Sequence, residues 1–505
     1  MSAAKNNKTS PAASRPMYEV IIVGAGFSGI GAAIKLDNIG IHDYQIVEKG
    51  DGIGGAWHFN TYPGVAVDIP SLSYSFSFER NPSWSRVFAP GEELKAYAEH
   101  CVRKYKLADR IRLNTGINGA TFDEQSGTWA LTTEQGETLT ARYIIGATGV
   151  LTQPKKPDIA GIDRFNGITM HTARWDHQVS LKGKRVAIIG TGASALQVIP
   201  EIAPEVKQLT VFQRTPIWVL PKPDSAIPRA LQRFMKAVPA VQLPARLISQ
   251  SLVEVGFVLT AHYHRYMPLA KGYEKVALDH LKRQVPDPEL RAKLTPHYGF
   301  GCKRPSVSNT YLKTFNRDNV SLVTDSISEV DATGVRTADG GHHEIDVLIC
   351  ATGFKVFEQG NMPPFAVTGA GKRDLESWWD EHRYQAYEGV SVPGFPNFFT
   401  ILGPNGYNGA SYFQLIEQQA RHIGRCLSEA RKKGATRVEV TANANDRYFK
   451  QMKQRSGNQV FFNNNCGTAN SYYFDKHGDV PFRPATSLEA HWRSARFPLK
   501  DYAFS

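Results

Sequence analysis

The stretch YEVIIVGAGFSGIGAAIKL, residues 18–36, carries the pattern that decides the fold. Residues 18–23 form an apolar run typical of a buried parallel strand, and residues 30–36 have helical character. The turn between them has the spacing G-x-G-x-x-G, given by Gly24, Gly26 and Gly29. Glycines at these positions permit a tight turn, let the backbone approach a pyrophosphate and let the helix pack closely on the sheet. This strand–turn–helix unit predicts an α/β fold that binds a dinucleotide.

An acidic residue follows the first unit at the expected distance. We expect a second strand over residues 44–47, and Glu48 comes next, about 20 positions after the last glycine. A carboxylate there accepts hydrogen bonds from a ribose and repels a 2′-phosphate. The first unit is therefore predicted to hold an unphosphorylated dinucleotide.

The same unit occurs a second time in RVAIIGTGASA, residues 185–195, where the spacing is G-x-G-x-x-A. The next strand, LTVFQR, is predicted to end at Arg214, so a cation stands where the first unit has an acid. Because arginine accommodates a 2′-phosphate, the second unit is predicted to bind NADPH. Thr215 and Lys303 are further candidate phosphate partners. A solvated surface charge is the alternative interpretation of Arg214.

The composition is that of an ordinary globular protein. Hydrophobic residues make up 42% of the 505 residues and charged residues 21%, and the length suits about three domains. The net charge of +12 alone suits nucleic acid, anionic membranes or phosphorylated small molecules. Because the sequence has no helix–turn–helix, zinc finger or basic stripe with interleaved aromatics, we expect no nucleic-acid partner.

The five cysteines include no C-x-x-C pair. We therefore expect neither a disulfide-built scaffold nor a thiol-redox or zinc motif. No apolar run reaches the roughly 18 residues of a membrane span, and residues 1–16 lack the apolar segment of a secretory signal. We expect residues 1–16 to be a disordered tail and the protein to be cytoplasmic, in a reducing compartment.

Apolar residues at helical spacing occur throughout residues 226–296, which predicts a helical insertion. Its aromatic positions are expected to lie in the core: Phe234, Phe257, Tyr263 and Tyr266. Two similar segments lie on either side of it, IIGATG at 144–149 and LICATGF at 348–354. Each is an apolar strand followed by a glycine that permits close backbone approach. We interpret them as places where the chain crosses between domains, with unrelated strand ends as the alternative.

Two longer motifs carry a resemblance to a known family. GGAWHFNTYPGVAVD spans residues 54–68, and FNGITMHTARWD spans residues 165–176, just before the second dinucleotide unit. On these motifs the chain resembles the type I Baeyer–Villiger monooxygenases, from Tyr18 to about Tyr407. The related flavin-containing monooxygenases usually carry Tyr where this chain has Trp175.

The resemblance implies an NADPH-dependent flavoprotein that uses FAD and O2. In the family, reduced flavin captures oxygen as a flavin-peroxide, which attacks a ketone, and the adduct rearranges to an ester or lactone. An arginine beside the flavin stabilises the peroxide. In KRPSVSNTYLKTFNRDNV, residues 303–320, Arg304 is the match, and Asp68 of the first motif is expected to pair with it.

The chemistry of these residue types agrees with the roles that the resemblance implies. An arginine supplies a permanent charge, and a carboxylate behind it fixes the planar guanidinium. A preorganised cation of this kind stabilises a developing anion. The alternatives are a phosphate clamp or a structural ion pair for Arg304, and a helix or turn cap for Asp68.

Other positions carry weaker expectations. The resemblance assigns His171 to the domain linker and to domain movement, with general acid–base chemistry as the alternative. Trp57 and Tyr62 are expected to wall the flavin, although core packing suits Trp57 equally well. FFNNNCGTANSYYFDKHG, residues 461–478, either closes the substrate cavity or forms an ordered surface loop. Tyr407, in GPNGYNG, is expected near the flavin ring.

The candidate site residues fall into three groups, and no metal ligands are predicted. The catalytic residues are Arg304 and Asp68. The cofactor-binding residues are Gly24, Gly26, Phe27, Ser28, Gly29, Glu48, Gly55, Trp57, Tyr62, Asp68, Tyr74, Gly190, Thr191, Gly192, Ala193, Ser194, Arg214, Thr215 and Lys303. The residues of the second motif are Phe165, Gly167, His171, Trp175 and Asp176.

The predicted architecture is α/β, with two Rossmann-like dinucleotide-binding domains, for FAD and NADPH, and a helical insertion. We assign residues 17–150 and 355–505 to the FAD domain, residues 151–225 and 297–354 to the NADPH domain, and residues 226–296 to the insertion. The substrate is predicted to be a small-molecule ketone, with a thioether as a further candidate.

Two other functions are compatible with parts of the sequence. A flavin-containing monooxygenase would oxidise sulfur or nitrogen in small molecules, and Trp175 and Arg304 argue against it. A nucleotide-binding sensor without enzymatic activity would need no arginine for oxygenation. A disulfide reductase is excluded because the cysteine pair that it requires is missing.

Overall fold

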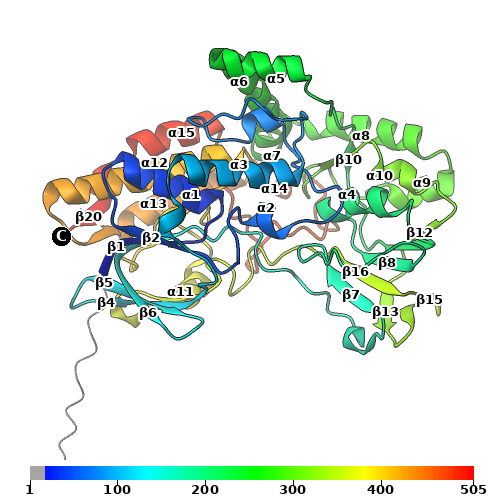
Figure 1. The fold of residues 1–505 in the computed structure, drawn as a ribbon, viewed down its shortest axis with the longest axis horizontal. Helices are drawn as coiled ribbons and strands as arrows, with labels where there is room; N and C mark the ends of the chain where they lie inside the picture. The colour runs from blue at the N-terminus through cyan, green and yellow to red at the C-terminus, as the bar shows by residue number, and fades with distance from the viewer. Residues whose placement is uncertain (1–16) are drawn as a thin grey trace, which may run out of the picture.

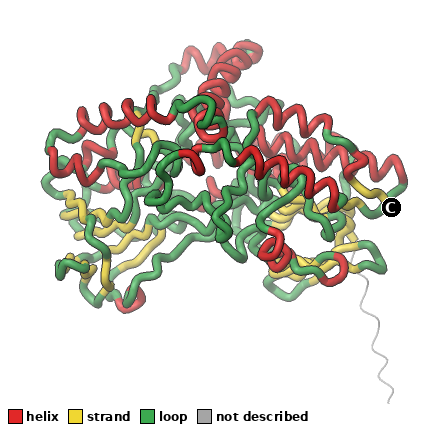
Figure 2. The backbone as a smooth tube through the Cα atoms, turned by 180° about the vertical axis from the view of Figure 1, so that it is seen from behind, coloured by secondary structure: helices red, strands yellow, loops and turns green. Residues whose placement is uncertain are grey.

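The computed structural model describes residues 17–505, so the tail predicted over residues 1–16 lies outside the described residues. Two sheets lie on opposite sides of the molecule, and helices cover them (Figure 1). Seen from behind, the two groups of strands are separated by helices and loops (Figure 2). This is the α/β arrangement that the two glycine-rich units predict.

The first sheet is built around the N-terminal strand. β1 (Met17–Val23) pairs in parallel with β2 (Tyr44–Val47) on one side and with β6 (Thr138–Gly146) on the other. Val20 and Ile22 are fully buried, as expected for a parallel strand covered on both faces. The sheet order is β17-β4-β5-β6-β1-β2-β3, and β18 also pairs with β6. The further strands are β3 (Ile111–Arg112), β4 (Ile117–Asp123), β5 (Thr128–Thr133), β17 (Ala366–Thr368) and β18 (Phe398–Thr400).

Three helices from distant parts of the chain pack beside this sheet. α1 (Phe27–Asn38) follows the glycine turn and contacts both α3 (Gly91–Lys104) and α12 (Tyr412–Lys433). The sequence of α1, FSGIGAAIKLDN, is rich in small residues, which allows it to lie close to its neighbours. Because α12 and β18 come from the last third of the chain, the first unit is assembled from both ends of the sequence.

The second sheet consists of five parallel strands in the order β12-β9-β8-β16-β7. Its strands are β7 (Ile168–His171), β8 (Arg185–Ile189), β9 (Gln208–Phe212), β12 (Val320–Val323) and β16 (Val347–Cys350). α4 (Ala193–Ile202) follows β8 and packs against α10 (Tyr311–Thr314). One boundary was predicted wrongly: β9 ends at Phe212, so Arg214 lies in the loop after the strand and not at its end. The backbone N–H of the intervening Gln213 still donates to the Val323 carbonyl (2.9 Å), one residue beyond the end of the strand.

Helices fill the region predicted to be an insertion. They are α5 (Arg229–Ala237), α6 (Gln242–Val253), a π-helical segment (Glu254–Leu259), α7 (Thr260–His262), α8 (Ala270–Gln284) and α9 (Pro288–Leu294). The expectation that its aromatic residues lie in the core is wrong for two of them. Phe234 is 52% exposed and Tyr266 is 69% exposed. Helical spacing identifies residues that share a face, and it does not say whether that face turns inward.

A disulfide joins Cys302 to Cys466, which are separated by 164 positions. The sequence did not predict this bond, because no local cysteine spacing indicates it. The other three cysteines are free and buried. Residues 461–478 are therefore tied to the segment that carries Arg304.

Further helices and strands complete the structure. They are α2 (Ala56–Phe59), α11 (Leu375–His382), α13 (Ala442–Ser456), α14 (Val460–Asn463), α15 (Ser487–Arg496), β10 (Val219–Leu220), β11 (Ser306–Val307), β13 (Ile327–Val330), β14 (Gly334–Thr337), β15 (His342–Glu344), β19 (Val438–Val440) and β20 (Tyr502–Phe504). Across residues 17–505, no helix has the length and apolar character needed to cross a membrane. The same residues contain no group of three or more side chains suited to hold a metal ion.

Candidate active site

Each glycine-rich turn is held against the end of a neighbouring strand. Gly24 has a φ of +111°, and a Cβ there would lie 2.6 Å from the carbonyl oxygen of Ala147. Gly190 has a φ of +107°, and a Cβ there would lie 2.5 Å from the carbonyl oxygen of Ala351. Glycine is required at both places, since the conformation and the space exclude a side chain. Ala147 and Ala351 belong to the two Ala-Thr-Gly segments, so these segments perform the same structural task in the two units.

The first unit places a carboxylate beside its glycine turn. Glu48 is 7% exposed and accepts hydrogen bonds from the backbone N–H groups of Ala25 (2.7 Å) and Gly50 (2.8 Å). Gly26 caps the N-terminus of α1, where unpaired N–H groups favour an anion. Gly55 faces Gly26, since a Cβ at Gly55 would lie 3.1 Å from the Gly26 Cα. These residues suit the pyrophosphate and ribose of FAD.

The remaining candidates of the first unit divide between the turn and the core. Ser28 and Gly29 are buried in the first turn of α1. The Phe27 ring packs on Phe413, with 4.5 Å between ring centroids, so its side chain belongs to the core. Trp57, on α2, meets the buried Tyr74 edge-on at 5.7 Å.

The first long motif connects the two dinucleotide units. The Gly54 N–H donates to the Ala25 carbonyl (3.0 Å), next to the first glycine turn. Further along, the Tyr62 hydroxyl donates to Gln197 Oε1 on α4 (3.0 Å). The Gln197 amide in turn donates to the Ala66 carbonyl (2.9 Å). Tyr62 thus contacts the second unit, a bridging position that sequence reasoning did not anticipate.

The second unit leaves open space and positive charge at the start of α4. A Cβ at Gly192, the N-cap of α4, would meet nothing within 4 Å. Ala193 and Ser194 form the first turn of that helix. Arg214 is exposed nearby, and burial together with the charge of Arg214 lowers the pKa of Lys303 to about 8. This open, cationic helix N-terminus fits a phosphorylated dinucleotide such as NADPH.

Two threonines of this unit already have partners. The Thr191 hydroxyl donates to the Thr215 carbonyl (3.0 Å). The Thr215 hydroxyl accepts a hydrogen bond from the Asn470 amide (2.8 Å). These bonds stabilise the loop around Arg214 and connect it to residues 461–478.

Arg304 and Asp68 form an ion pair, although 236 positions separate them. Arg304 Nε donates to Asp68 Oδ2 at 2.7 Å, and the two side chains are 23% and 36% exposed. Burial acts to raise the pKa of Asp68, but the charge and hydrogen bond of Arg304 outweigh it and hold the pKa below its ordinary value. Because Nε carries this contact, the two terminal nitrogens of the guanidinium remain for other partners.

Two aromatic side chains lie beside the arginine. Arg304 Nη1 approaches the Tyr407 hydroxyl at 3.5 Å. The Arg304 guanidinium also lies over the Phe257 ring, 5.6 Å from its centroid. Sequence reasoning missed Phe257, which it assigned to the core of the insertion, because a helical pattern carries no information on contacts over such a sequence distance.

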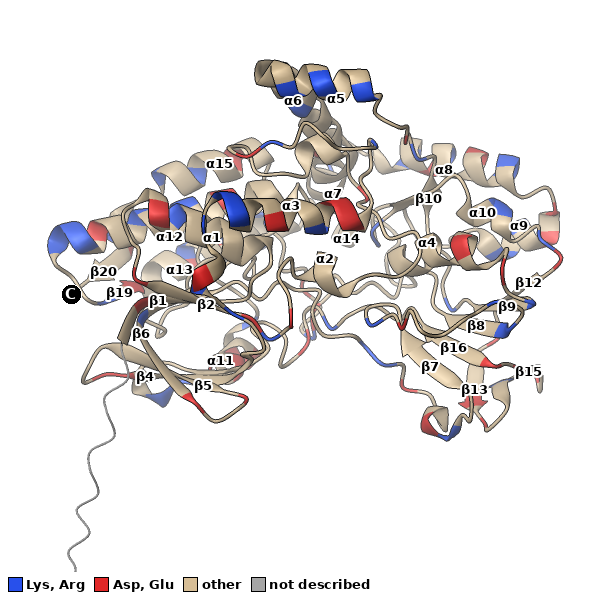
Figure 3. Ribbon diagram, in the orientation of Figure 1, with Lys and Arg blue, Asp and Glu red and all other residues tan. Residues whose placement is uncertain are grey.

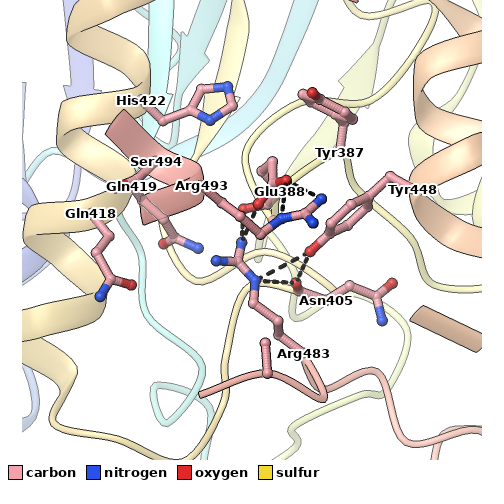
Figure 4. A network of polar contacts seen from close by, with 12 residues as sticks. Tyr387, Glu388, Asn405, Gln418, Gln419, His422, Tyr448, Arg483, Arg493 and Ser494 are labelled. Carbon is pink, nitrogen blue, oxygen red and sulfur yellow. Dashed lines mark hydrogen bonds and ion pairs between the residues drawn. The ribbon is translucent and has the colours of Figure 1, made fainter. Parts of the chain in front are cut away.

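A buried network holds the loop that carries Tyr407 (Figure 4). The Arg483 N–H donates to the Tyr407 carbonyl (2.7 Å), and Arg483 Nε donates to the Asn405 carbonyl (3.2 Å). The Glu388 carboxylate forms ion pairs with Arg483 (3.2 Å) and with Arg493 (2.7 Å). Arg483 and Glu388 are each at most 3% exposed, so this charged cluster rigidly fixes the loop.

The second long motif lies at the edge of the second sheet. His171 ends β7, an edge strand of the second sheet. Burial and the charge of Arg174 lower the pKa of His171 to about 4, so the ring is neutral near pH 7. Its Nδ1 accepts from the Ala173 N–H (3.0 Å).

The other residues of that motif have structural contacts. Gly167 is packed so closely that a Cβ there would lie 2.4 Å from the Phe165 ring. Trp175 packs at the edge of the second sheet's core. Asp176 accepts from the Gln178 N–H (2.9 Å). These contacts lie within the motif and against the core of the second sheet.

Comparison with known proteins agrees with this geometry. Residues 21–249 match the family model described as pyridine nucleotide-disulphide oxidoreductase. The chain is 39% identical to a Baeyer–Villiger monooxygenase of Pseudomonas aeruginosa, over 92% of this chain and 87% of the relative. It is 38% identical to a Baeyer–Villiger monooxygenase of Streptomyces coelicolor, over 96% and 92%.

Solved structures give the same result. An oxidised steroid monooxygenase bound to NADP superposes with a TM-score of 0.86 and 28% identity, over 97% of this chain and 99% of the other. A closed structure of cyclohexanone monooxygenase has the same TM-score, identity and coverage. OTEMO in complex with FAD and NADP gives 0.85 and 27%, over 97% and 100%. The chain belongs to the Baeyer–Villiger monooxygenase family.

Proposed function

We propose that this chain uses FAD, NADPH and O2 to insert an oxygen atom next to a ketone carbonyl, giving an ester or lactone. The observation that carries the proposal is the Arg304–Asp68 ion pair, with its 2.7 Å bond and its flanking Tyr407 and Phe257. Bound FAD, once reduced by NADPH, supplies the activation of O2. The residues of the chain bind, orient and stabilise the reactants.

Arg304 is the residue that we propose to stabilise negative charge on the reacting oxygen. Asp68 holds the guanidinium through Nε, which leaves Nη2 to donate to the substrate, while Nη1 lies 3.5 Å from the Tyr407 hydroxyl. Burial acts to lower the pKa of Arg304, but the negative charge of Asp68 outweighs it, and the pKa stays well above its ordinary value. The cation therefore persists over the whole working pH range, which a donor to an anion requires.

The two units bind different dinucleotides in this proposal. Glu48 accepts hydrogen bonds from the FAD ribose, and Arg214 with Lys303 binds the 2′-phosphate of NADPH. We assign residues 17–150 and 355–505 to FAD, and residues 151–225 and 297–354 to NADPH. We assign His171 a structural or hinge role rather than acid–base chemistry, because its low pKa makes it a weak base near neutrality.

A substrate panel tests the function. Purified FAD-loaded enzyme is offered cyclic, linear, aryl and steroid ketones and a thioether, with NADPH in air. We expect ketone-dependent NADPH and O2 consumption and a product heavier by one oxygen atom, identified as an ester by mass spectrometry. Sulfoxide formation without any ester would assign the chain to sulfur oxidation instead.

The cellular location is a further proposal. We place the enzyme in the cytoplasm on the basis of its sequence. Disulfides are rare in that reducing compartment, so the Cys302–Cys466 bond would respond there to redox conditions. Cell fractionation, with alkylation of free thiols before lysis, measures both the location and the state of the bond.

A further inference from the structure

Helix α6 turns its polar side chains toward the protein. Gln242, Arg246 and Ser249 are at most 5% exposed. Arg246 donates from Nη1 to the Ser75 hydroxyl (3.0 Å) and from Nη2 to the Ser75 carbonyl (2.9 Å). The Ser249 hydroxyl lies 2.9 Å from the Ser73 hydroxyl. These bonds fix the orientation of the helix.

The opposite face of the helix is apolar and open. The exposed large apolar side chains of α5 and α6 are each between 46% and 65% exposed: Leu231, Phe234, Leu243, Leu247, Ile248 and Leu252. We call α5 and α6, with the residues 238–241 that join them, the hairpin, and these six residues the hairpin patch. A surface helix normally buries its apolar stripe, so α6 has the reverse of the usual arrangement. An apolar surface of this kind indicates an interaction site.

Further exposed apolar side chains lie on α15, whose first residue contacts the segment that follows α6. The Ser487 N–H at the start of α15 donates to Glu254 (3.0 Å), just after α6. From α15, Leu488 is 79% exposed and Trp492 is 56% exposed. Tryptophan and leucine on exposed helices are typical of contact with a lipid headgroup region.

The segment that carries the hairpin patch contains basic residues and no acidic ones. Residues 226–253 contain Arg229, Arg233, Lys236 and Arg246, and no Asp or Glu. The first three are exposed on α5. Figure 3 shows Lys and Arg but no Asp or Glu on α5 and α6. The hairpin therefore combines an exposed apolar face with unpaired cations.

We propose that the α5–α6 hairpin docks on an anionic lipid surface. Its leucine, isoleucine and phenylalanine side chains would enter the headgroup–acyl boundary, while Arg229, Arg233 and Lys236 contact lipid phosphates. A second copy of the chain is a poorer occupant. Two-fold docking through the same patch would bring these cations toward their own copies with no acid in the hairpin to neutralise them.

The hairpin leads directly toward the candidate active site. α6 continues through the π-helical segment Glu254–Leu259, which carries Phe257, the aromatic partner of Arg304. From Leu247 to Phe257 the helix rises about 15 Å. An apolar ketone dissolved in the membrane would thus have a short route to the arginine, an extension that rests on the proposed function.

Vesicle binding tests the docking without any turnover. FAD-loaded enzyme is floated with vesicles of phosphatidylcholine alone or with 30% phosphatidylglycerol. We expect binding to the anionic vesicles that weakens with salt. Replacing both Leu247→Ser and Ile248→Ser should weaken it about 10-fold or more, since two inserted side chains are lost. The matched control, Val276→Ser with Leu278→Ser, changes two exposed residues of α8 and should bind normally.

Charge variants make a second, independent test. Replacing the three α5 cations together, Arg229→Gln, Arg233→Gln and Lys236→Gln, should weaken binding roughly 100-fold, at about fivefold per cation. The control changes three exposed lysines that lie just before β8 and β9 in the sequence. They are Lys182→Gln, Lys184→Gln and Lys207→Gln. Equal losses in both sets would show a general charge effect and overturn the proposal.

Two further outcomes would also overturn the proposal. The first is that the wild-type enzyme does not bind anionic vesicles. The second is a wild-type dimer in light scattering that the Leu247→Ser, Ile248→Ser enzyme no longer forms, which would assign the patch to a second copy. Turnover of a water-soluble ketone should be unchanged in the hairpin variants. If neither the wild type nor the variants convert any ketone while the wild type still binds vesicles, the proposed function fails and the docking stands.

Discussion

Replacing Arg304 by alanine should separate reduction of the flavin from oxygenation of the ketone. Hydride transfer requires only that nicotinamide and flavin be held together, and Arg304→Ala leaves both glycine-rich turns intact. Oxygen insertion additionally needs a donor for a developing anion. Removing one preorganised donor costs about 10²–10³ in kcat, so ester formation should fall by at least about 100-fold. NADPH consumption should continue, with hydrogen peroxide as its product.

Two milder variants rank the contributions of the ion pair. Arg304→Lys keeps the charge but lacks the planar fork that Asp68 holds at 2.7 Å, so it should recover only part of the ester yield. Asp68→Asn can still accept from Arg304 Nε, although without charge assistance. Because the guanidinium is then held less firmly, the activation free energy of ester formation should rise by about 1 kcal/mol, which lowers the rate about fivefold.

The assay measures ester, hydrogen peroxide and NADPH in the same reaction. Flavin content and anaerobic bleaching by NADPH confirm in each variant that the protein is folded and loaded. Ester formation by Arg304→Ala at a near wild-type rate would refute the role of the arginine. Failure of the variant to be reduced would instead assign Arg304 to nicotinamide binding.

Four other measurements probe separate parts of the site. Arg214→Ala should raise the KM for NADPH about 10- to 150-fold and barely change that for NADH, and equal losses for both would contradict the phosphate contact. Because the pKa of Lys303 lies near 8, the KM for NADPH should increase as pH rises through that value and the ammonium loses its proton. Lys303→Arg should remove this dependence. Cys302→Ser should lower stability by about 2–4 kcal/mol and abolish the drop in melting temperature that a reductant causes in the wild type. Gly26→Val should yield folded but colourless protein, since a Cβ there meets only the Gly55 backbone at 3.5 Å, whereas Gly29→Ala should misfold against the Gly24 carbonyl at 1.9 Å.

Local patterns predicted the dinucleotide units well. The strands β1, β2 and β8 and the helix after the first glycine turn lie where the sequence places them, because glycine spacing and apolar runs act over fewer than about 25 residues. The end of β9 was misplaced, since the boundary depends on hydrogen bonds to β12, more than 100 residues later. Boundaries of this kind are set by tertiary contacts.

The candidate site depends on contacts that no local pattern contains. Arg304 and Asp68 were paired through family resemblance, whereas Phe257 and the link from Tyr62 to Gln197 come from elements that only the folded chain brings together. The Cys302–Cys466 bond is a further example, because each cysteine stands alone in its own stretch of sequence. Such pairings require the topology to be known first.

The hairpin shows a different limit of sequence reasoning. Leu243, Leu247, Ile248 and Leu252 have helical spacing, and that spacing alone indicates a stripe that packs on the core. In the structure Arg246 and Ser249 take the inward face, because their hydrogen bonds to Ser75 and Ser73 satisfy polar groups that would otherwise be buried alone. Periodicity thus specifies which residues share a face, and the direction of that face depends on the polar partners opposite. Once those partners orient α6, the leucines and the isoleucine must face outward, and a lipid surface is the environment in which both they and the α5 cations are stabilised.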